Sequence, residues 1–419
     1  MKGYGKELAL FEGKPTDVGG LVEHYLDYKP QGQLQSDGVV HFHIPSNAQK
    51  YINLAKCKLE VKFKMSRKDG AKMQPKENCS IANIPLFTLW RQTDFYIQQQ
   101  LVSTCGSNYA YKAYMDLLLD KSVYENSPLV DAYLLSKDTV GAMDSVSVGS
   151  PLSNEGFLER LLTIDGGRTR QVIGTPAIDF FKCGRLLLPG LALDLKLYPN
   201  TSEFVLMAEK NEYKLELVDA LFSVCTVEVG ADIAMGHIET LKFGPALYPY
   251  RRTDFKSFSV AAGLYEFTYD NVWLDKVPRN VTIAVVSSAA YSGKINKNPL
   301  SFPHFNVNFL AVYVDGSSRP GRPLAPNFAA KMYTEAFYSI ADKTGIVGYT
   351  DYGSGYTMYN LKLNGTSDTE KFETVEKRAH TRVEIKFAKA LPESVVVLVY
   401  AQHDACVGIT SDRNVEIRT

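Results

Sequence analysis

The 419-residue chain carries 46 lysines and arginines against 46 aspartates and glutamates, so its formal net charge is zero, which argues against a protein whose main task is to coat nucleic acid. At 45% hydrophobic and 22% charged residues, the composition is far from that of an intrinsically disordered chain. The length exceeds that of one ordinary core and predicts two domains of roughly 200 residues each.

The cysteines and the apolar runs indicate the compartment in which the protein is made. The six cysteines are scattered, without a Cys-x-x-Cys pair, which predicts unbridged and mostly buried thiols in a reducing compartment. They are Cys57, Cys79, Cys105, Cys183, Cys225 and Cys406. The amino-terminal residues lack the apolar stretch of a signal peptide, and the longest apolar run, Val395 to Ala401, is too short to span a bilayer. We therefore expect an intracellular product without a membrane span.

The first residues differ in pattern from those that follow. Residues 1–37 alternate only weakly between apolar and polar, and we interpret them as an extended N-terminal arm that lies over another part of the structure. Alternation typical of strands begins at Val39–Ile44 and continues in Cys57–Met65, where lysines occupy one face. Interleaved aromatic and β-branched residues predict further strand structure between Phe87 and Ser103.

Two helices interrupt the strands of the first half. Ser107 and Asn108 are placed to cap the first of them. Its apolar residues at helical spacing are Tyr111, Tyr114, Met115 and Leu118. The second helix is predicted over Ser153–Leu162, with Glu155 closing its cap, and the turn-rich segment Asn126–Ser150 between them predicts a long loop.

The rest of the chain is dominated by strands, with helices predicted over Val229–Leu241 and Asn327–Ile340. The predicted strands are Arg170–Ile178, Leu191–Tyr198, Ser202–Ala208, Tyr213–Val229 with a bend at Asp219, Phe255–Ala261, Val281–Ser287, Asn308–Val314, Tyr356–Leu363, Thr381–Phe387, Ser394–Tyr400 and Val415–Arg418. Neither half alternates strand and helix regularly. That order predicts an all-β protein with two antiparallel sandwiches in tandem, over residues 38–229 and 230–419.

Motifs that carry chemistry are missing from the sequence. It contains no GxSxG, no P-loop and no HExxH. His41 and His43 point to one face of a strand, as two metal ligands would, but Asp37 stands alone and no third ligand has a recognisable spacing. His403-Asp404 has the composition of an acid–base pair, yet it follows the end of a predicted strand, where an ordinary loop is expected.

Two further candidate functional sites are better explained by a structural role. His237 lies on the apolar face of its predicted helix, which favours a core or interface histidine. Arg251-Arg252, beside Tyr248 and Tyr250, has the residues for stacking on bases or binding phosphate, but in a neutral chain a solvated turn or a subunit contact is favoured. We therefore predict no catalytic, cofactor-binding or metal-binding residue.

Several segments, in chain order, resemble one protein family. They are HFHIPSNAQKYINLAKCKLEVKFKM, FTLWRQTDFYIQQQLVSTCGSNYAYKAYMDLLL, Leu310–Gly316, Gly355–Tyr359 and Ser394–Ala401. Together they resemble the double jelly-roll major capsid (hexon-like) proteins of Polinton/Maverick elements, adintoviruses and adomaviruses, over most of the chain from about Gly38. The sequence departs from that family at Trp90-Arg91-Gln92 and in the loop Asp131–Ser150, which leaves the loop conformations open.

The resemblance implies a double jelly roll, in which two eight-stranded antiparallel β-sandwiches stand side by side and short helices lie in the connecting loops. It implies a structural major capsid protein whose homotrimers form pseudo-hexameric capsomers, which tile an icosahedral shell around a DNA genome. The implied location is the virion, after assembly inside the host cell. The implied partners are neighbouring capsomers and a penton or minor capsid protein, without sequence-specific nucleic-acid binding, enzymatic activity or a cofactor.

Three alternatives remain open at the level of sequence, and one of them, nucleic-acid binding by a local patch on one face, is disfavoured by the charge balance. A β-sandwich rich in tyrosine is also typical of carbohydrate-binding or glycoside-active proteins, although the 25 tyrosines are spread evenly along this chain. Such a protein would be a monomer or small oligomer with a tyrosine-lined groove. A host-domesticated capsid relative that no longer forms virions would keep the same folding constraints as a viral capsid protein.

Overall fold

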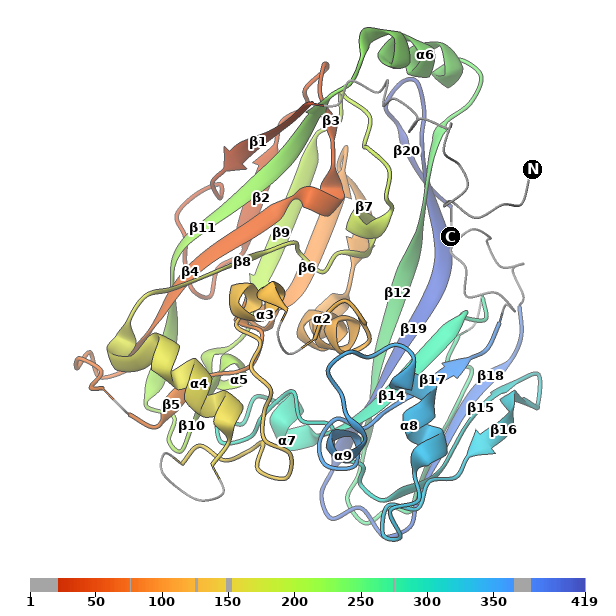
Figure 1. The fold of residues 1–419 in the computed structure, drawn as a ribbon. Helices are drawn as coiled ribbons and strands as arrows, with labels where there is room; N and C mark the ends of the chain where they lie inside the picture. Colours follow the sequence, from red (N-terminus) through yellow and green to blue (C-terminus); the bar gives the residue numbers. More distant parts are fainter. Residues whose placement is uncertain are drawn as a thin grey trace, which may run out of the picture.

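The computed structural model describes residues 22–75, 77–124, 127–147, 153–273, 276–364 and 378–418. It is mostly β, with 41% of residues in strands and 19% in helices. Two sandwiches stand side by side and converge at the top of Figure 1, where α6 (Ala231–Leu241) connects them. The predicted all-β fold with two antiparallel sandwiches is confirmed.

The first sandwich is built from strands that precede α6. They are β1 (Val22–Tyr28), β2 (Val40–Ile44), β3 (Tyr51–Ile52), β4 (Lys58–Arg67), β5 (Cys79–Ile81), β6 (Trp90–Ile97), β7 (Gln100–Thr104), β8 (Arg170–Gly174), β9 (Leu193–Pro199), β10 (Leu206–Ala208) and β11 (Tyr213–Glu228). One sheet has the order β1-β11-β4-β8, with β3 also paired to β11. The other has the order β2-β9-β6-β7, and β5 and β10 form a separate pair.

The second sandwich repeats this plan with strands that follow α6. They are β12 (Ala246–Val260), β13 (Glu266–Asp270), β14 (Asn280–Ser287), β15 (Val307–Val314), β16 (Ser317–Leu324), β17 (Met358–Lys362), β18 (Thr381–Phe387), β19 (Val395–Ile409) and β20 (Val415–Arg418). One sheet has the order β12-β19-β14-β17, with β20 paired to β19, and the other has the order β13-β18-β15-β16. Among the described strands, no ladder joins the two sandwiches. The division into folding units at residues 229 and 230 stays a prediction.

The remaining helices are short and lie in the connections. They are α1 (Pro85–Thr88), α2 (Tyr109–Leu118), α3 (Pro128–Tyr133), α4 (Glu155–Ile164), α5 (Ser202–Val205), α7 (Ser288–Tyr291), α8 (Thr334–Ala341) and α9 (Tyr349–Tyr352). In Figure 1 they occupy the middle and lower part of the molecule, away from α6. The helix α2 is buried along most of its length, because it lies where the two sandwiches meet.

Strand burial follows the sequence pattern. In β4 the apolar residues Leu59, Val61, Phe63 and Met65 are buried and alternate with partly exposed polar residues, as expected of a sheet with one covered face. In β14 all eight residues are buried, because both faces of this sheet are covered. Most buried apolar residues of the two sandwiches form one continuous cluster, and Val146, Phe157, Leu161 and Met207 form a second, smaller one.

The predicted N-terminal arm, residues 1–37, stays a prediction, and part of it forms a strand. Residues 1–21 lie outside the described residues. Val22–Tyr28 form the edge strand β1, which pairs with β11 from Val22 opposite Glu228 to Tyr28 opposite Phe222. The weak alternation in this segment arises because β1 is exposed along nearly its whole length.

In three segments the observed secondary structure differs from the predicted one, because local turns interrupt the predicted element. The helix predicted over Asn327–Ile340 begins only at Thr334, since Asn327 forms a β-bridge with Met332 and Lys331 adopts a φ of 56°. The predicted strand Ser202–Ala208 begins as the helix α5. The predicted loop Asn126–Ser150 contains the helix α3.

The predicted helix caps also differ, whereas the predicted bend in β11 is confirmed. A 3-10 turn over Gly106–Asn108 leads into α2 without a side-chain cap. The N-terminus of α4 is capped by Asn154, whose Oδ1 accepts a hydrogen bond from the backbone nitrogen of Phe157 at 3.4 Å, and not by Glu155. In β11 the register against β4 shifts between Leu217 and Asp219, as a β-bulge requires.

Candidate functional site

A polar network buried between the sandwiches centres on Lys112 of α2. Its side chain is 0% exposed, and its Nζ lies 2.6 Å from Asp179 Oδ1 and 3.0 Å from Asp116 Oδ2. It also donates a hydrogen bond to the carbonyl oxygen of Ala177 at 2.6 Å. Burial alone would lower the pKa of Lys112, but the two carboxylates outweigh burial and hold that pKa well above its ordinary value.

The two carboxylates extend this network into the second sandwich. Asp179 accepts hydrogen bonds from the backbone nitrogen (2.7 Å) and the hydroxyl (3.2 Å) of Thr253 in β12. Asp116 accepts one from the hydroxyl of Tyr400 in β19 at 2.7 Å and forms a 2.9 Å salt bridge with Lys182. Burial alone would raise the pKa of Asp116, but the two lysine charges and the tyrosine hydroxyl hold it below its ordinary value.

A second buried network centres on Arg160 of α4. Arg160 and Asp138 are both 0% exposed at the side chain, and Nη2 lies 2.7 Å from Asp138 Oδ1. The other guanidinium nitrogens, Nε and Nη1, donate to the carbonyl oxygens of Ile81 (2.9 Å) and Ser136 (3.1 Å). Asn154 Nδ2 donates to Asp138 Oδ1 at 2.9 Å. All three nitrogens of the arginine therefore have a partner.

Asp138 connects this second network to the second sandwich. Asn298 Nδ2 donates to Asp138 Oδ2 at 2.8 Å. The hydroxyl of Tyr356 accepts from the backbone nitrogen of Asp138 (3.1 Å) and donates to its carbonyl oxygen (3.2 Å). Asn298 and Tyr356 both follow α6 in the chain, so the loop that carries Asp138 bridges the two halves.

Aromatic pairs also join residues that precede α6 to residues that follow it. Tyr111 of α2 stacks on Tyr291 of α7 with ring centroids 5.5 Å apart. Phe180 meets Tyr250 of β12 edge to face at 5.3 Å. Such pairs contribute beyond the area that they bury. The junction therefore has the packing of a protein core, and contacts on both sides of it join the two sandwiches.

The histidines of β2 share an acceptor that their spacing in the sequence does not reveal. His41 Nε2 and His43 Nδ1 each lie 2.8 Å from Oδ1 of Asp194, in the paired strand β9. Burial alone would raise the pKa of Asp194, but the two imidazoles outweigh burial and lower it. Over the described ranges, no group of three His, Cys, Asp or Glu residues is arranged to hold a metal ion. The contact joins two strands within one sheet.

His403 and His237 lie in different surroundings. His403 lies within β19 and not in a loop, because that strand continues to Ile409. It is 8% exposed, and burial lowers its pKa to about 4. Its neighbour Asp404 points to the opposite face of the strand and lies 3.4 Å from Arg279. His237 is exposed on α6, where its Nδ1 lies 2.9 Å from the hydroxyl of Tyr51.

The arginine pair lies inside a strand, and so the predicted turn is wrong. Arg251 and Arg252 belong to β12, paired with β19. Tyr248 and Tyr250 are buried, and their hydroxyls donate to the carbonyl oxygens of Leu186 and Val102. These rings are therefore covered and do not offer a stacking surface to a base.

All six cysteines are thiols, and none forms a disulfide. Cys57, Cys79, Cys105 and Cys225 are buried. Burial raises the pKa of the Cys57 and Cys105 thiols to about 12, so both stay protonated and unreactive.

Exposed apolar side chains gather at several surfaces. They are found on β1 (Val22, Tyr25, Leu26), on α6 and just after it (Met235, Ile238, Phe243), around β13 (Leu264, Tyr265, Tyr269) and near α8 (Met332, Tyr338). The strand β1 is also the edge of its sheet, and an exposed apolar edge is a surface on which another chain can pair.

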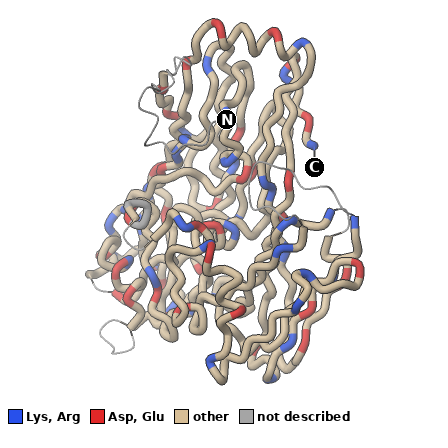
Figure 2. The backbone as a smooth tube through the Cα atoms, turned by 45° about the vertical axis from the view of Figure 1, so that its right-hand side comes forward, with Lys and Arg blue, Asp and Glu red and all other residues tan. Residues whose placement is uncertain are grey.

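Charged residues of both signs are intermixed along both sandwiches, as Figure 2 shows. None of the helices within the described ranges has the length and apolar character needed to cross a membrane.

Comparison with solved structures identifies the fold. The chain aligns over 100% of its length with 92% of a chain in the structure of the Sputnik virophage, with a TM-score of 0.62 and 12% identity. It aligns over 99% of its length with 93% of the mavirus major capsid protein, with a TM-score of 0.58 and 9% identity. The chain has the double jelly-roll fold. The Faustovirus major capsid protein gives the same TM-score of 0.58, with 7% identity over 99% of this chain and 93% of its own.

Sequence comparison finds similarity in an animal protein. No family model matches the sequence. An uncharacterized protein of Caenorhabditis elegans is 26% identical over 406 residues, which cover 91% of this chain and 93% of the nematode protein. Because that alignment covers nearly all of both chains, it extends over both sandwiches of the double jelly roll.

Proposed function

We propose that this chain is a structural major capsid protein. Three copies form a pseudo-hexameric capsomer, and capsomers tile an icosahedral shell around a DNA genome. The observation that carries the proposal is the alignment of nearly the whole chain, both sandwiches together, with nearly the whole of the mavirus and Faustovirus major capsid proteins. An alignment with one sandwich would have supported only a generic β-sandwich.

The rigidity of the junction supports this role. In a pseudo-hexameric capsomer, each of three copies contributes two sandwiches, which make six similar corners. The two sandwiches of one copy must therefore be fixed relative to each other. The networks around Lys112 and Arg160 and the aromatic contacts between them provide that rigidity. A sandwich protein that binds sugar has no comparable need for two domains joined by buried ions.

The surface also suits self-association. The exposed apolar residues on β1 and around β13 and α8 are of the kind that obligate interfaces bury, at roughly 2,000–5,000 Å² per interface. Intermixed charges on a chain of zero net charge let identical copies approach without long-range repulsion. The proposed location is accordingly the virion, with assembly inside the host cell and a penton or minor capsid protein as a further partner.

Glycan binding, the alternative, is not favoured by the position of the tyrosines. Tyr109, Tyr114, Tyr352, Tyr356 and Tyr359 are among the largest fully buried side chains. They contribute to the core and not to an open groove. A structural role also requires no catalytic group.

Mass measurement combined with negative-stain imaging of the purified protein tests the proposal. We expect particles of about 140 kDa, three times the 46.7 kDa chain, with a hexagonal outline, and closed shells at higher protein concentration. A stable 46.7 kDa monomer at micromolar concentration that binds sugars in a glycan array would overturn the capsid function and favour the alternative.

A further inference from the structure

A polar cavity lies between the two sandwiches, next to the Lys112 network. It has a volume of about 450 Å³, which is within the range of roughly 300–1,000 Å³ found for pockets that hold small ligands. Residues 179–185 of the first sandwich form one wall, and residues of β12 and β19 in the second sandwich form another. The described residues that line it include four cations and two carboxylates, which are Lys182, Arg185, Arg251, Arg279, Asp179 and Asp404.

Most of these charges are balanced within the chain. The Lys112 network, to which Asp179 and Lys182 belong, contains two lysines and two carboxylates and is therefore neutral. Arg279 forms an ion pair with Asp404, with Nη1 at 3.4 Å from Oδ2. Two guanidinium groups among the residues that line the cavity are then in excess.

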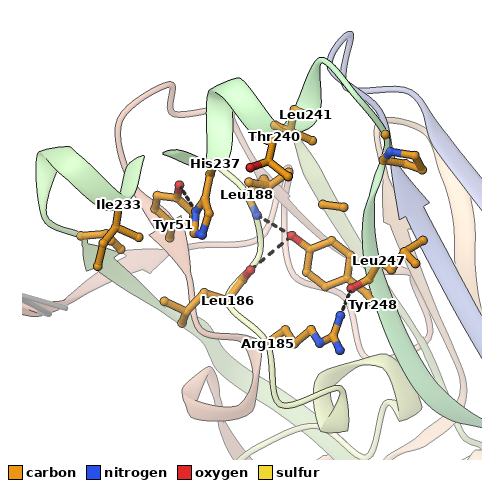
Figure 3. Close-up of a pocket in the computed structure, with 14 residues that line it drawn as sticks. Tyr51, Arg185, Leu186, Leu188, Ile233, His237, Thr240, Leu241, Leu247 and Tyr248 are labelled. Carbon is orange, nitrogen blue, oxygen red and sulfur yellow. Dashed lines mark hydrogen bonds between the residues drawn. The ribbon is translucent and has the colours of Figure 1, made fainter. Parts of the chain in front are cut away.

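The two cations in excess are Arg251 and Arg185. Neither forms an ion pair with a described residue, and Nη2 of Arg251 is buried without a hydrogen-bond partner among them. Arg185 is exposed and donates one hydrogen bond, to the carbonyl oxygen of Leu247 at 2.5 Å. Figure 3 shows this bond in the neighbouring cavity beneath α6, which Arg185 also lines. Because buried donors in folded proteins nearly always have an acceptor, Arg251 indicates that an acceptor binds here.

The strand pairing shows why the protein itself does not supply this acceptor. Arg251 lies opposite Asp404 in the ladder between β12 and β19, so the two side chains share one face of the sheet. Asp404, however, is paired with Arg279, which is only 5% exposed. Arg252 is the next residue of β12, points to the opposite face and does not line the cavity.

We propose that this cavity binds a phosphate group, either as inorganic phosphate or as the phosphate of a small phosphorylated molecule. Arg251 binds it inside the cavity, and Arg185 binds it at the opening. The planar guanidinium group matches two phosphate oxygens at once. A phosphate monoester carries a charge of about −1.5 to −2 at pH 7, which balances two guanidinium groups, whereas a single carboxylate balances one. This site goes beyond the proposed function, because one folded copy contains all of it.

Titration calorimetry of the full-length protein with inorganic phosphate, at constant ionic strength, tests this proposal. We expect Arg251→Met to weaken phosphate binding by at least about tenfold, because it removes a charge-assisted donor. Arg185→Met should weaken it as well, and because Arg185 is exposed this variant should fold even if Arg251→Met does not. Arg252→Met is the matched control and should bind phosphate as the wild type does.

Thermal unfolding gives a second readout. Without phosphate, Arg251→Met should melt no lower than the wild type, because it removes a buried donor that has no acceptor. Phosphate should raise the melting temperature of the wild type and of Arg252→Met, since a ligand that binds only the folded state stabilises it. It should leave the melting temperature of Arg251→Met nearly unchanged.

Three results would overturn the proposal. They are the absence of binding at millimolar phosphate, equal affinities in the wild type and both cavity variants, and binding of a DNA oligonucleotide by a protein that does not bind phosphate. Titration with AMP distinguishes the sources of the phosphate: tighter binding of AMP supports a phosphorylated molecule, and equal or weaker binding supports inorganic phosphate. A monomer that binds phosphate through Arg251 would count against the capsid function alone.

Discussion

The two polar networks that join the sandwiches balance a buried charge in different ways. Around Lys112, one buried cation faces two carboxylates, and a second lysine, Lys182, completes the balance from a position that is 62% exposed. Around Arg160, one cation faces one carboxylate, both are 0% exposed, and neutral amides and carbonyls supply the other hydrogen bonds. In the Arg160 network, the two opposite charges balance, and neutral dipoles supply the remaining hydrogen bonds. In the Lys112 network, the second carboxylate is balanced by a lysine that reaches solvent.

This difference has an energetic consequence. Removing Lys112 leaves two buried carboxylates with only the mostly exposed Lys182 as a cation, whereas removing Arg160 leaves one carboxylate that still accepts hydrogen bonds from two amides. The stability of the junction should therefore depend more on Lys112 than on Arg160.

The largest expected effect is that of Lys112→Met. It should lower the free energy of unfolding by about 3–5 kcal/mol, because it leaves Asp179 without its cation and Asp116 with Lys182 alone. The shift of the urea unfolding midpoint measures this. Lys182→Met, in the same network but exposed, is the matched control and should change stability by less than about 1 kcal/mol. Equal losses in the two variants would mean that the buried lysine is not the centre of the network.

A smaller loss, of about 2–3 kcal/mol, is expected for Arg160→Met, since Asp138 retains the amides of Asn154 and Asn298. The same urea series measures it. Arg168→Met, on an exposed arginine near the end of the same helix, should stay within about 0.5 kcal/mol of the wild type. A loss as large as that of Lys112→Met would contradict the expected difference in stability between the two networks.

The two networks can also be compared by removing one tyrosine hydroxyl from each and measuring the loss of stability. Tyr400→Phe removes a donor to the charged Asp116 and should cost about 1.5–2 kcal/mol, whereas Tyr356→Phe removes contacts to backbone groups only and should cost about 1 kcal/mol. Differential scanning calorimetry of both variants measures the difference. The reverse order would show that the loop carrying Asp138 depends on Tyr356 more than its hydrogen bonds suggest.

The smallest effect is a pH dependence of the Lys112→Met defect. In the wild type the pKa of Asp116 is lowered by folding, so its contribution is present above the unfolded pKa of about 3.9 and is lost as the pH falls through the folded value. Without Lys112 the carboxyl group keeps Lys182 and Tyr400 but loses its largest compensation for burial, so its pKa lies higher than in the wild type and the variant loses less stability as the pH falls. The gap between the two proteins should narrow by about 1 kcal/mol between pH 7 and pH 4. Arg168→Met should show a constant difference, and a constant gap for Lys112→Met as well would exclude Asp116 as the titrating group.

Local periodicity in the sequence is sufficient to predict elements whose burial alternates regularly. The pattern of Lys58–Arg67 predicts a strand, because its lysines face solvent while Val61 and Phe63 are buried. The helix over Tyr109–Leu118 is predicted from the helical spacing of its large apolar residues, although most of its residues are buried. Elements without such contrast were missed. The strand β16 contains Pro320 and Pro323 and is the last strand of its sheet, where a proline removes no required ladder hydrogen bond.

The candidate sites could be predicted only where their partners are near in sequence. Lys112 and Asp116 are four residues apart, but Asp179 is contributed by a later turn and Tyr400 by the other sandwich. His41 and Asp194 are 153 residues apart. The available signal was a lysine within a tyrosine-rich apolar helix, which indicates a buried charge without indicating what pairs with it.

The state of the cysteines has a consequence for the folded chain in compartments of different redox potential. All six are unbridged, and the buried ones sit where neither an oxidant nor a thiol reductant has ready access. The fold of one copy therefore contains no disulfide that a reductant could break. Its stability should then be the same on either side of a cell membrane, whatever the glutathione poise there.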